Sequence, residues 1–257
     1  MSFMDKFSIK GKKYIVTGGA QGIGKAVSAA MADCGAQVGI FDMNIDLARK
    51  TAAELQEKYG TKVEAFQCNV TDPAQVEQAY AAFLDSFGEL DGVFNNAGIC
   101  QHKAATEVDA GEWSKVVNVN LNGVFLIAQA AGRYFIEQGK KGSIVNTASM
   151  SGHIVNIPQP QASYNASKAG VIQLTKSLAV EWAGNGVRVN CISPGYVGSD
   201  MVTLVRQDWQ DVWLGMIPYH RYCDAEELAG AVIYLLSDAS TYTSGCDIVI
   251  DGCFTDI

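Results

Sequence analysis

The stretch Tyr14-Ile15-Val16-Thr17-Gly18-Gly19-Ala20-Gln21-Gly22-Ile23-Gly24 decides the fold of this chain. It begins as a short apolar run, which is typical of a buried strand, and it continues into a turn rich in glycine. The apolar pattern of residues 23–34 then predicts a helix. Glycines let backbone N–H groups approach an anion, and a helix N-terminus adds partial positive charge. The stretch therefore predicts a strand, a phosphate-binding turn and a helix.

The spacing of the glycines leaves two other interpretations open. Gly18-x3-Gly22-x-Gly24 differs from the Gly-x-Gly-x-x-Gly pattern of the usual dinucleotide-binding turn. Residues 19–25 fit most of the phosphate loop of nucleoside triphosphatases, but Ala26 provides no hydroxyl group for Mg²⁺. A glycine-rich turn that binds no ligand is the other alternative.

Strands and helices alternate along the rest of the chain. The expected strands after the first are 37–42, 63–68, one that begins at 92–94, 143–147, 187–192 and 246–250. The expected helices are 23–34, 45–59, 73–87, 111–138, 164–182 and 225–236. Such alternation builds βαβ units, and strands that are apolar throughout are buried on both faces. The sequence therefore predicts one α/β domain over 1–257, a doubly wound fold of the Rossmann type whose parallel seven-stranded sheet carries helices on both faces.

Composition excludes several classes of protein. A net charge of −8 argues against a nucleic-acid surface and a basic membrane patch. No apolar run is long enough for a membrane span, and the N-terminus lacks the apolar core of a signal peptide. The seven cysteines form no Cys-x-x-Cys pair and share no ligand spacing with His102 or His220. We expect no metal site, thiols kept reduced, and a cytoplasmic location.

Asp42 closes the second predicted strand, about 20 residues beyond the glycine turn. A carboxylate there accepts the ribose hydroxyl protons of NAD and repels the additional phosphate of NADP. Its neighbours Phe41, Met43 and Asn44 include no arginine or lysine. The pattern favours NAD over NADP, with a solvated loop aspartate as the alternative.

Tyr164 and Lys168 lie four residues apart, so a helix places them one turn apart on the same face. A free tyrosine has a pKa near 10 and is a poor base at neutral pH, but a nearby ammonium stabilises the phenolate. We therefore expect Lys168 to lower the pKa of Tyr164. Taken alone the pair is a weak signal, because most such pairs are neighbours on a surface.

Further motifs accompany this pair in a fixed order. They are the glycine turn, Asn95-Asn96-Ala97-Gly98, Asn120, Ser149, Tyr164-x3-Lys168 and Pro194-Gly195. With these motifs the sequence resembles the short-chain dehydrogenase/reductase family over nearly the whole chain. The resemblance implies that Tyr164 is the general acid/base, that Ser149 orients the reacting oxygen, that Lys168 holds the nicotinamide ribose and tunes Tyr164, and that Asn120 anchors a water in a proton path.

The same resemblance implies a cofactor site. Its expected residues are Gly18, Gln21, Gly22, Ile23, Gly24, Asp42, Met43, Asn69, Val70, Asn96, Ala97, Gly98, Tyr164, Lys168, Pro194, Gly195, Val197 and Ser199. Three positions depart from the family pattern. Ser199 replaces the usual threonine, Asn69 stands where aspartate is common, and Cys253 replaces a glycine near the C-terminus.

The substrate is indicated by the segment 149–161, which joins the catalytic serine to the tyrosine. It resembles polyol dehydrogenases and ketose reductases acting on mannitol, sorbitol, arabitol or xylulose. Candidate substrate residues are His153, Gln159 and Tyr196, and the alternative for the first two is a turn facing solvent or a second subunit.

Residues 196–222 are expected to form a lid over the substrate. The lid carries Trp209 and Trp213 on one helix face, and we favour packing of that face on the domain. The aromatic residues leave open a steroid or other apolar alcohol as substrate. A catalytically silent NAD-binding regulator is a third interpretation. The resemblance also implies a homotetramer or homodimer.

Overall fold

A computed structural model describes residues 2–256, apart from the side chain at position 200, and contains one parallel sheet of seven strands. The strands are Lys13–Thr17 (β1), Gln37–Asp42 (β2), Val63–Gln67 (β3), Gly92–Asn95 (β4), Gly142–Thr147 (β5), Val187–Pro194 (β6) and Asp247–Ile250 (β7). They pair in the order β3-β2-β1-β4-β5-β6-β7. The predicted fold is confirmed.

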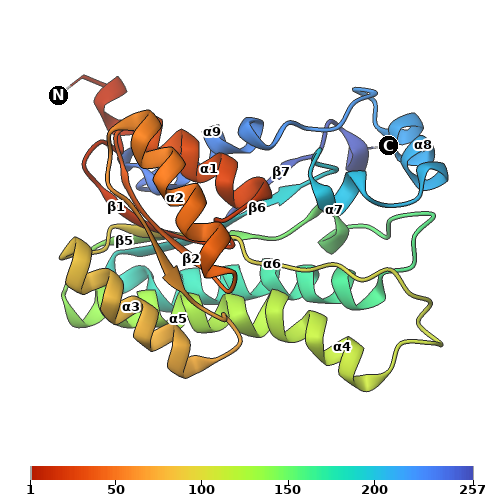
Figure 1. Ribbon diagram of the computed structural model, residues 1–257, viewed down its shortest axis with the longest axis horizontal. Coiled ribbons are helices and arrows are strands. Elements are labelled where there is room, and N and C mark those ends of the chain that lie inside the picture. Colours follow the sequence, from red (N-terminus) through yellow and green to blue (C-terminus); the bar gives the residue numbers. More distant parts are fainter. Residues whose placement is uncertain (1, 257) are drawn as a thin grey trace.

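Helices cover both faces of the sheet (Figure 1). One face carries α1 (Gly22–Asp33), α2 (Ile45–Tyr59) and α9 (Ala229–Leu236). The other face carries α3 (Pro73–Phe87), α5 (Val124–Glu137) and α6 (Ala162–Trp182). The remaining α-helices are α4 (Ala110–Val117), α7 (Asp200–Thr203) and α8 (Gln207–Met216). No helix within residues 2–256 is both long and apolar enough to cross a membrane.

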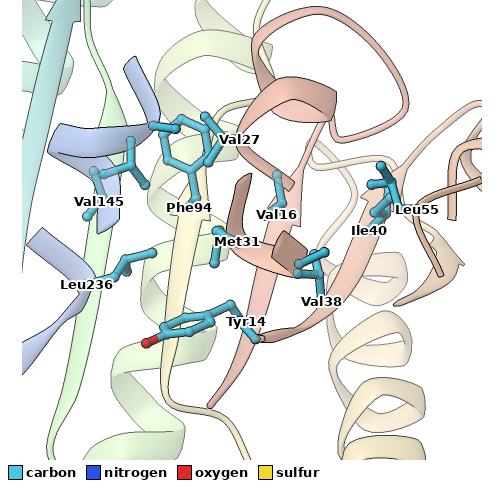
Figure 2. Packing of buried hydrophobic residues seen from close by; sticks show 14 of the residues in the cluster. Tyr14, Val16, Val27, Met31, Val38, Ile40, Leu55, Phe94, Val145 and Leu236 are labelled. Carbon is cyan, nitrogen blue, oxygen red and sulfur yellow. The ribbon is translucent and has the colours of Figure 1, made fainter. Parts of the chain in front are cut away.

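A row of buried side chains crosses the sheet from strand to strand. Val16 on β1 pairs with Ile40 on β2 and with Phe94 on β4. Because successive side chains of a strand point to opposite faces, these three lie on one face, where they pack against Val27 and Met31 of α1 (Figure 2). This packing fixes α1 against β1 and so fixes the glycine turn that joins them.

The carboxyl ends of the parallel strands meet at one edge of the sheet. β1 ends at Thr17, β4 at Asn95 and β5 at Thr147, and these strands are neighbours. β2 and β3 lie on the far side of β1, so the direction in which the sheet grows reverses between β1 and β4. In open α/β sheets ligands bind beside such a point, outside the carboxyl ends.

The long helix predicted over 111–138 is present from Ala110 to Glu137, but it is not α-helical throughout. The structure divides this segment into α4, a π-helical segment over Asn118–Gly123, and α5. Hydrogen bonds in a π-helix span five residues, so the helix is locally widened, a feature that is frequent at functional sites. The predicted helix over 225–236 is also divided, into a 3₁₀ turn over Ala225–Leu228 followed by α9.

Candidate active site

The glycine turn has the backbone geometry that its sequence suggests. Gly18 and Gly22 adopt φ angles of 63° and 55°, in the left-handed region that favours glycine. A Cβ atom on Gly24 would collide with the carbonyl oxygen of Gly18 and the Asn96 amide. Thr17 Oγ1 accepts hydrogen bonds from the N–H groups of Asn96 (2.9 Å) and the next residue (3.0 Å), which ties the turn to the end of β4.

A long groove runs along the carboxyl edge from this turn to α6. It brings together most of the predicted cofactor residues: Gly18, Gln21, Gly22, Ile23, Asp42, Met43, Asn69, Val70, Asn96, Ala97, Gly98, Tyr164, Lys168 and Ser199. Pro194, Gly195 and Val197 line an adjoining cavity instead, and Gly24 lies buried inside α1. Open glycine backbone, a helix N-terminus and an extended groove fit a dinucleotide cofactor.

Asp42 lies in this groove at the end of β2. Its carboxylate accepts hydrogen bonds from the backbone N–H of Ala20 (3.2 Å) and of Asn44 (2.9 Å), which hold it beside the glycine turn. Lys168 is the lone lysine or arginine among the described residues that line the groove. The groove therefore presents a negative charge at the end of β2.

The departure at Asn69 has a clear structural consequence. Its side-chain oxygen accepts hydrogen bonds from the N–H (3.1 Å) and the hydroxyl (2.9 Å) of Thr71. Asn69 lines the groove, and its amide NH₂ makes no hydrogen bond to the described residues, so this position carries a donor where aspartate would carry only acceptors. Cys253 adopts a φ angle of 67°, so its backbone keeps the conformation that a glycine would favour.

Tyr164, Ser149 and Lys168 meet where the groove joins the smaller cavity. Lys168 is buried, its ammonium donates a 2.7 Å hydrogen bond to the carbonyl oxygen of Thr147, and it lies 5.6 Å from the centre of the Tyr164 ring. Ser149 precedes the 3₁₀ turn over Met150–Gly152, just past the end of β5, and it lines the smaller cavity together with Tyr164.

The protein alone does not lower the pKa of Tyr164 as we expected. Burial raises the pKa of this phenol, with a smaller opposing effect from the Ser149 hydrogen bond. Burial also lowers the pKa of Lys168 to about 8. Removing either group from water disfavours its charged form, and this effect exceeds the attraction that helix spacing suggested.

Asn120 occupies the π-helical segment and is fully buried. Its amide oxygen accepts the N–H of Ile99 at 2.8 Å, while its NH₂ donates to the carbonyl of Ile99 at 2.9 Å and to the hydroxyl of Ser167 at 3.1 Å. These bonds join the loop after β4 to α6, which carries Tyr164. The proposed part of Asn120 in a proton path stays a prediction.

The smaller cavity opens beside the groove. Five residues line both spaces: Ile23, Thr147, Tyr164, Ser199 and Met201. A substrate in the smaller cavity would therefore meet the cofactor at Tyr164. Of the predicted substrate residues, Gln159 and Tyr196 line this cavity.

His153 lies outside both spaces, so the structure does not bring it to the candidate site. A 3₁₀ turn over Met150–Gly152 directs it toward β7, where its Nε2 lies 2.7 Å from the carboxylate of Asp247. That carboxylate also accepts a 2.8 Å hydrogen bond from the hydroxyl of Ser193. We predicted His153 as a substrate residue because it lies close to Ser149 in the sequence. The turn directs the His153 side chain away from the cavity that Ser149 lines.

Among the residues that line the smaller cavity, sequence reasoning missed Cys100, His102, Ser151, Asn156 and Gln161. The Gln161 amide donates to Ser151 Oγ (3.2 Å) and Asn156 Oδ1 (3.2 Å), and all three side chains are buried. A concentration of amide side chains between the catalytic serine and tyrosine was the available signal. Burial raises the pKa of the Cys100 thiol to about 12, so the thiol stays neutral.

The expected lid comprises α7, α8 and their flanking loops. Trp213 is fully buried and stacks on Tyr196 with ring centres 4.5 Å apart, while Trp209 contacts His102 edge-on at 5.3 Å. The tryptophan face therefore packs on the domain, as we favoured. In doing so it forms part of the cavity wall.

Comparisons with known proteins agree with this geometry. A sequence family described as "Enoyl-(Acyl carrier protein) reductase" matches residues 18–255. The NADP-dependent mannitol dehydrogenase of Hypocrea jecorina is 43% identical over 98% of this chain and 95% of its own length. A sorbose reductase of Candida albicans is 45% identical over 98% of this chain and 90% of its own. A short-chain type dehydrogenase/reductase from Mycobacterium marinum has a solved structure that matches with a TM-score of 0.96, 42% identity and 99% coverage of both chains.

The family match spans nearly the whole chain, and the matched structure shares its fold from end to end. The groove, the glycine turn and the meeting of Tyr164, Ser149 and Lys168 supply the corresponding machinery. The chain belongs to the short-chain dehydrogenase/reductase family and is a nicotinamide-dependent oxidoreductase acting on a CH–OH group.

Proposed function

We propose that the protein transfers a hydride between a nicotinamide cofactor and a sugar alcohol/ketose pair. The observation that carries this proposal is the polar wall of the smaller cavity, where Ser151, Asn156, Gln159, Gln161 and Tyr196 are all buried. These side chains hydrogen-bond mainly to one another, and a wall of fixed polar groups matches the hydroxyl groups of a polyol better than an apolar substrate, which would leave polar atoms unpaired. The names of the two fungal relatives, a mannitol dehydrogenase and a sorbose reductase, support the same substrate class.

In this mechanism Tyr164 exchanges the hydroxyl proton of the substrate, as general acid in ketone reduction and general base in alcohol oxidation. Its raised pKa keeps the phenol protonated at neutral pH, ready to act as the acid. Ser149 orients the reacting oxygen, and Lys168, held against the Thr147 carbonyl, would bind the ribose of a nicotinamide cofactor. Such a cofactor, when bound, would supply the hydride-transfer chemistry.

We infer a preference for NAD over NADP from the groove itself. The comparisons point the other way, because the related mannitol dehydrogenases are named NADP-dependent, which favours NADP over the NAD predicted from the sequence. In this chain Asp42 presents a carboxylate beside the glycine turn, and the described groove residues near it include no cation to bind a further phosphate. Specificity toward NADP requires a positive partner for that phosphate.

Two other interpretations remain open to the same assay. The aromatic residues of the lid fit an apolar secondary alcohol such as a steroid, although Trp209 and Trp213 pack on the domain. A silent NAD-binding regulator would not need Ser149, Tyr164 and Lys168 together. We further propose that the protein is a homotetramer or homodimer. We also propose a cytoplasmic location, because all seven cysteines are free, as in a reducing compartment.

Oxidation of NADH and of NADPH should be followed with fructose, sorbose, xylulose, ribulose and a steroid ketone. We expect turnover of a ketose, with NADH preferred. Turnover with NADPH alone would refute the inference from Asp42, and turnover of the steroid alone would refute the polyol proposal. No turnover with any of them would leave the regulator as the better account.

Replacing Tyr164 by Phe tests the catalytic assignment. We expect the rate to fall by a factor of about 100 to 10,000, as for loss of a general acid, with NADH binding retained. Tyr242→Phe is the matched control, because that side chain is fully exposed. Full turnover in Tyr164→Phe would rule out the mechanism.

A further inference from the structure

Tyr196, on the loop after β6, sits at the centre of the polar wall. Its ring is nearly parallel to that of Trp213, at an interplanar angle of 16°, and meets Phe254 edge-on at 5.4 Å. Its hydroxyl lies 3.0 Å from the amide nitrogen of Gln159 and 3.2 Å from that of Asn156. The phenol is thus fixed by aromatic contacts at the ring and by two amides at the oxygen.

The direction of these hydrogen bonds follows from Trp213. An indole N–H can only donate, and that of Trp213 lies 2.8 Å from the amide oxygen of Gln159. Gln159 must therefore turn its oxygen to Trp213 and its NH₂ to Tyr196. Asn156 is oriented in the same sense, because its oxygen accepts from the hydroxyl of Ser151 at 2.6 Å. Both amides donate to the Tyr196 oxygen.

The proton of Tyr196 is consequently left over. The phenol oxygen accepts two hydrogen bonds, and no acceptor for its own O–H occurs among the described residues. Burial raises the pKa of Tyr196, so the phenol keeps this proton at neutral pH. The residue lines the cavity that Ser149 and Tyr164 also line. Two accepted bonds also polarise the O–H and strengthen it as a donor.

We propose that Tyr196 determines specificity by donating its O–H to an oxygen of the substrate chain away from the reacting carbon. This inference rests on the proposed polyol/ketose activity and names the contact by which such a substrate is distinguished from an apolar one. A hydroxylated substrate supplies the missing acceptor. An apolar ketone leaves the buried donor without a partner, which is unfavourable.

The first test is Tyr196→Phe, measured with a ketose and with 2-hexanone, a ketone of similar length without hydroxyl groups. We expect kcat/KM for the ketose to fall about 10-fold to 100-fold, mainly through KM, while kcat/KM for 2-hexanone is unchanged or rises. Thermal stability should fall, since Asn156 and Gln159 lose an acceptor. An equal loss with both substrates, or no loss with the ketose, would show that the hydroxyl is only structural.

Gln159→Glu separates the donor role from the presence of the hydroxyl. Burial raises the pKa of the introduced carboxyl group, so this variant is assayed over a range of pH that extends above that pKa. Once ionised, the carboxylate accepts both from Trp213 and from the Tyr196 O–H, which withdraws the proton from the cavity while tyrosine remains. We expect the same loss toward the ketose, with 2-hexanone unaffected. Retained ketose activity in Gln159→Glu would overturn the donor assignment.

Tyr222→Phe is the control for both variants. Tyr222 belongs to the same lid, its hydroxyl contacts Gln210 at 3.5 Å, and it does not line the cavity. Its kinetics should match those of the parent enzyme, and a similar loss of ketose specificity in this control would overturn the proposal. If the parent enzyme reduces no ketose, the proposed function fails. If it does and Tyr196→Phe keeps the same substrate preference, only the role of Tyr196 fails.

Discussion

Burial of the Lys168 ammonium in the candidate site lowers the stability of the folded protein. Below about pH 8 its side chain is protonated in the folded and the unfolded chain alike, and the folded state carries the full cost of burying the charge. Between about pH 8 and 10.5 the folded chain releases a proton that the unfolded chain retains, so stability rises with pH. A pKa of about 8 in place of 10.5 corresponds to roughly 3 kcal/mol against the charged form.

Lys168→Met should therefore lose activity and gain stability at neutral pH. We expect its advantage in the free energy of unfolding over the parent chain to reach up to about 3 kcal/mol near pH 7, less the hydrogen bond to Thr147. The advantage should shrink as pH rises through 8 toward 10.5. Denaturant unfolding at several pH values measures it, with Lys176→Met, an exposed lysine of α6, as control. A pH-independent difference would contradict the assignment.

The glycine turn between β1 and α1 depends on a close approach of the Gly24 backbone to the carbonyl group of Gly18. Gly24→Ala places a Cβ against the carbonyl of Gly18, so we expect a loss of about 1–3 kcal/mol in stability and weaker NADH binding. Gly230→Ala is the matched helix glycine, with nothing within 4 Å of the added carbon, and should gain about 0.5–1 kcal/mol. Thermal unfolding and NADH titration measure both. A Gly24→Ala variant as stable as the parent would refute the close contact.

The elements themselves could be predicted from the sequence, since apolar runs, proline and glycine mark where each begins and ends. The π-helical segment could not, because what holds Asn120 is its pair of hydrogen bonds with Ile99, a residue far from it in the chain. His153 was misplaced for a related reason. The direction of the short turn after Ser149 depends on the carboxylate of Asp247, which lies on β7.

Site residues could be predicted where a sequence motif fixes their positions. They could not be predicted where their positions depend on packing between distant segments. Tyr164 and Lys168 share a helix face, and the glycine turn must follow β1, so both groups could be placed. The wall formed by Asn156, Gln159 and Gln161 depends on Trp213 of α8 packing on Tyr196. No local pattern connects those segments. The pKa of Tyr164 also depends on packing between distant segments, because their contacts bury the phenol and so raise its pKa.

Across the whole molecule, apolar side chains remain exposed on the outer helices of one layer. Phe125 and Ile136 of α5 are each 38% exposed, and Val180 of α6 is 81% exposed. Exposed apolar side chains of this kind favour association between copies, in accord with the proposed dimer or tetramer.

Phe125→Asp combined with Val180→Asp should therefore lower the assembly state. We expect the parent protein to elute in gel filtration at two or four times 27.5 kDa and the variant at a smaller multiple. Met4→Asp, at an exposed N-terminal position, is the control and should leave elution unchanged. An unaltered elution of the double variant would place the contact on another face.

The left-handed backbone at Cys253 has a consequence for how the protein ages. A side chain in that conformation costs about 1 kcal/mol or more relative to glycine. The thiol is also exposed, as is that of Cys34, so air can couple two molecules through these positions. Cys253 thus combines an unfavourable backbone conformation with a thiol that is accessible to oxidation. A single glycine there would relieve the backbone and remove one of the two accessible thiols, which lengthens the useful life of a stored sample.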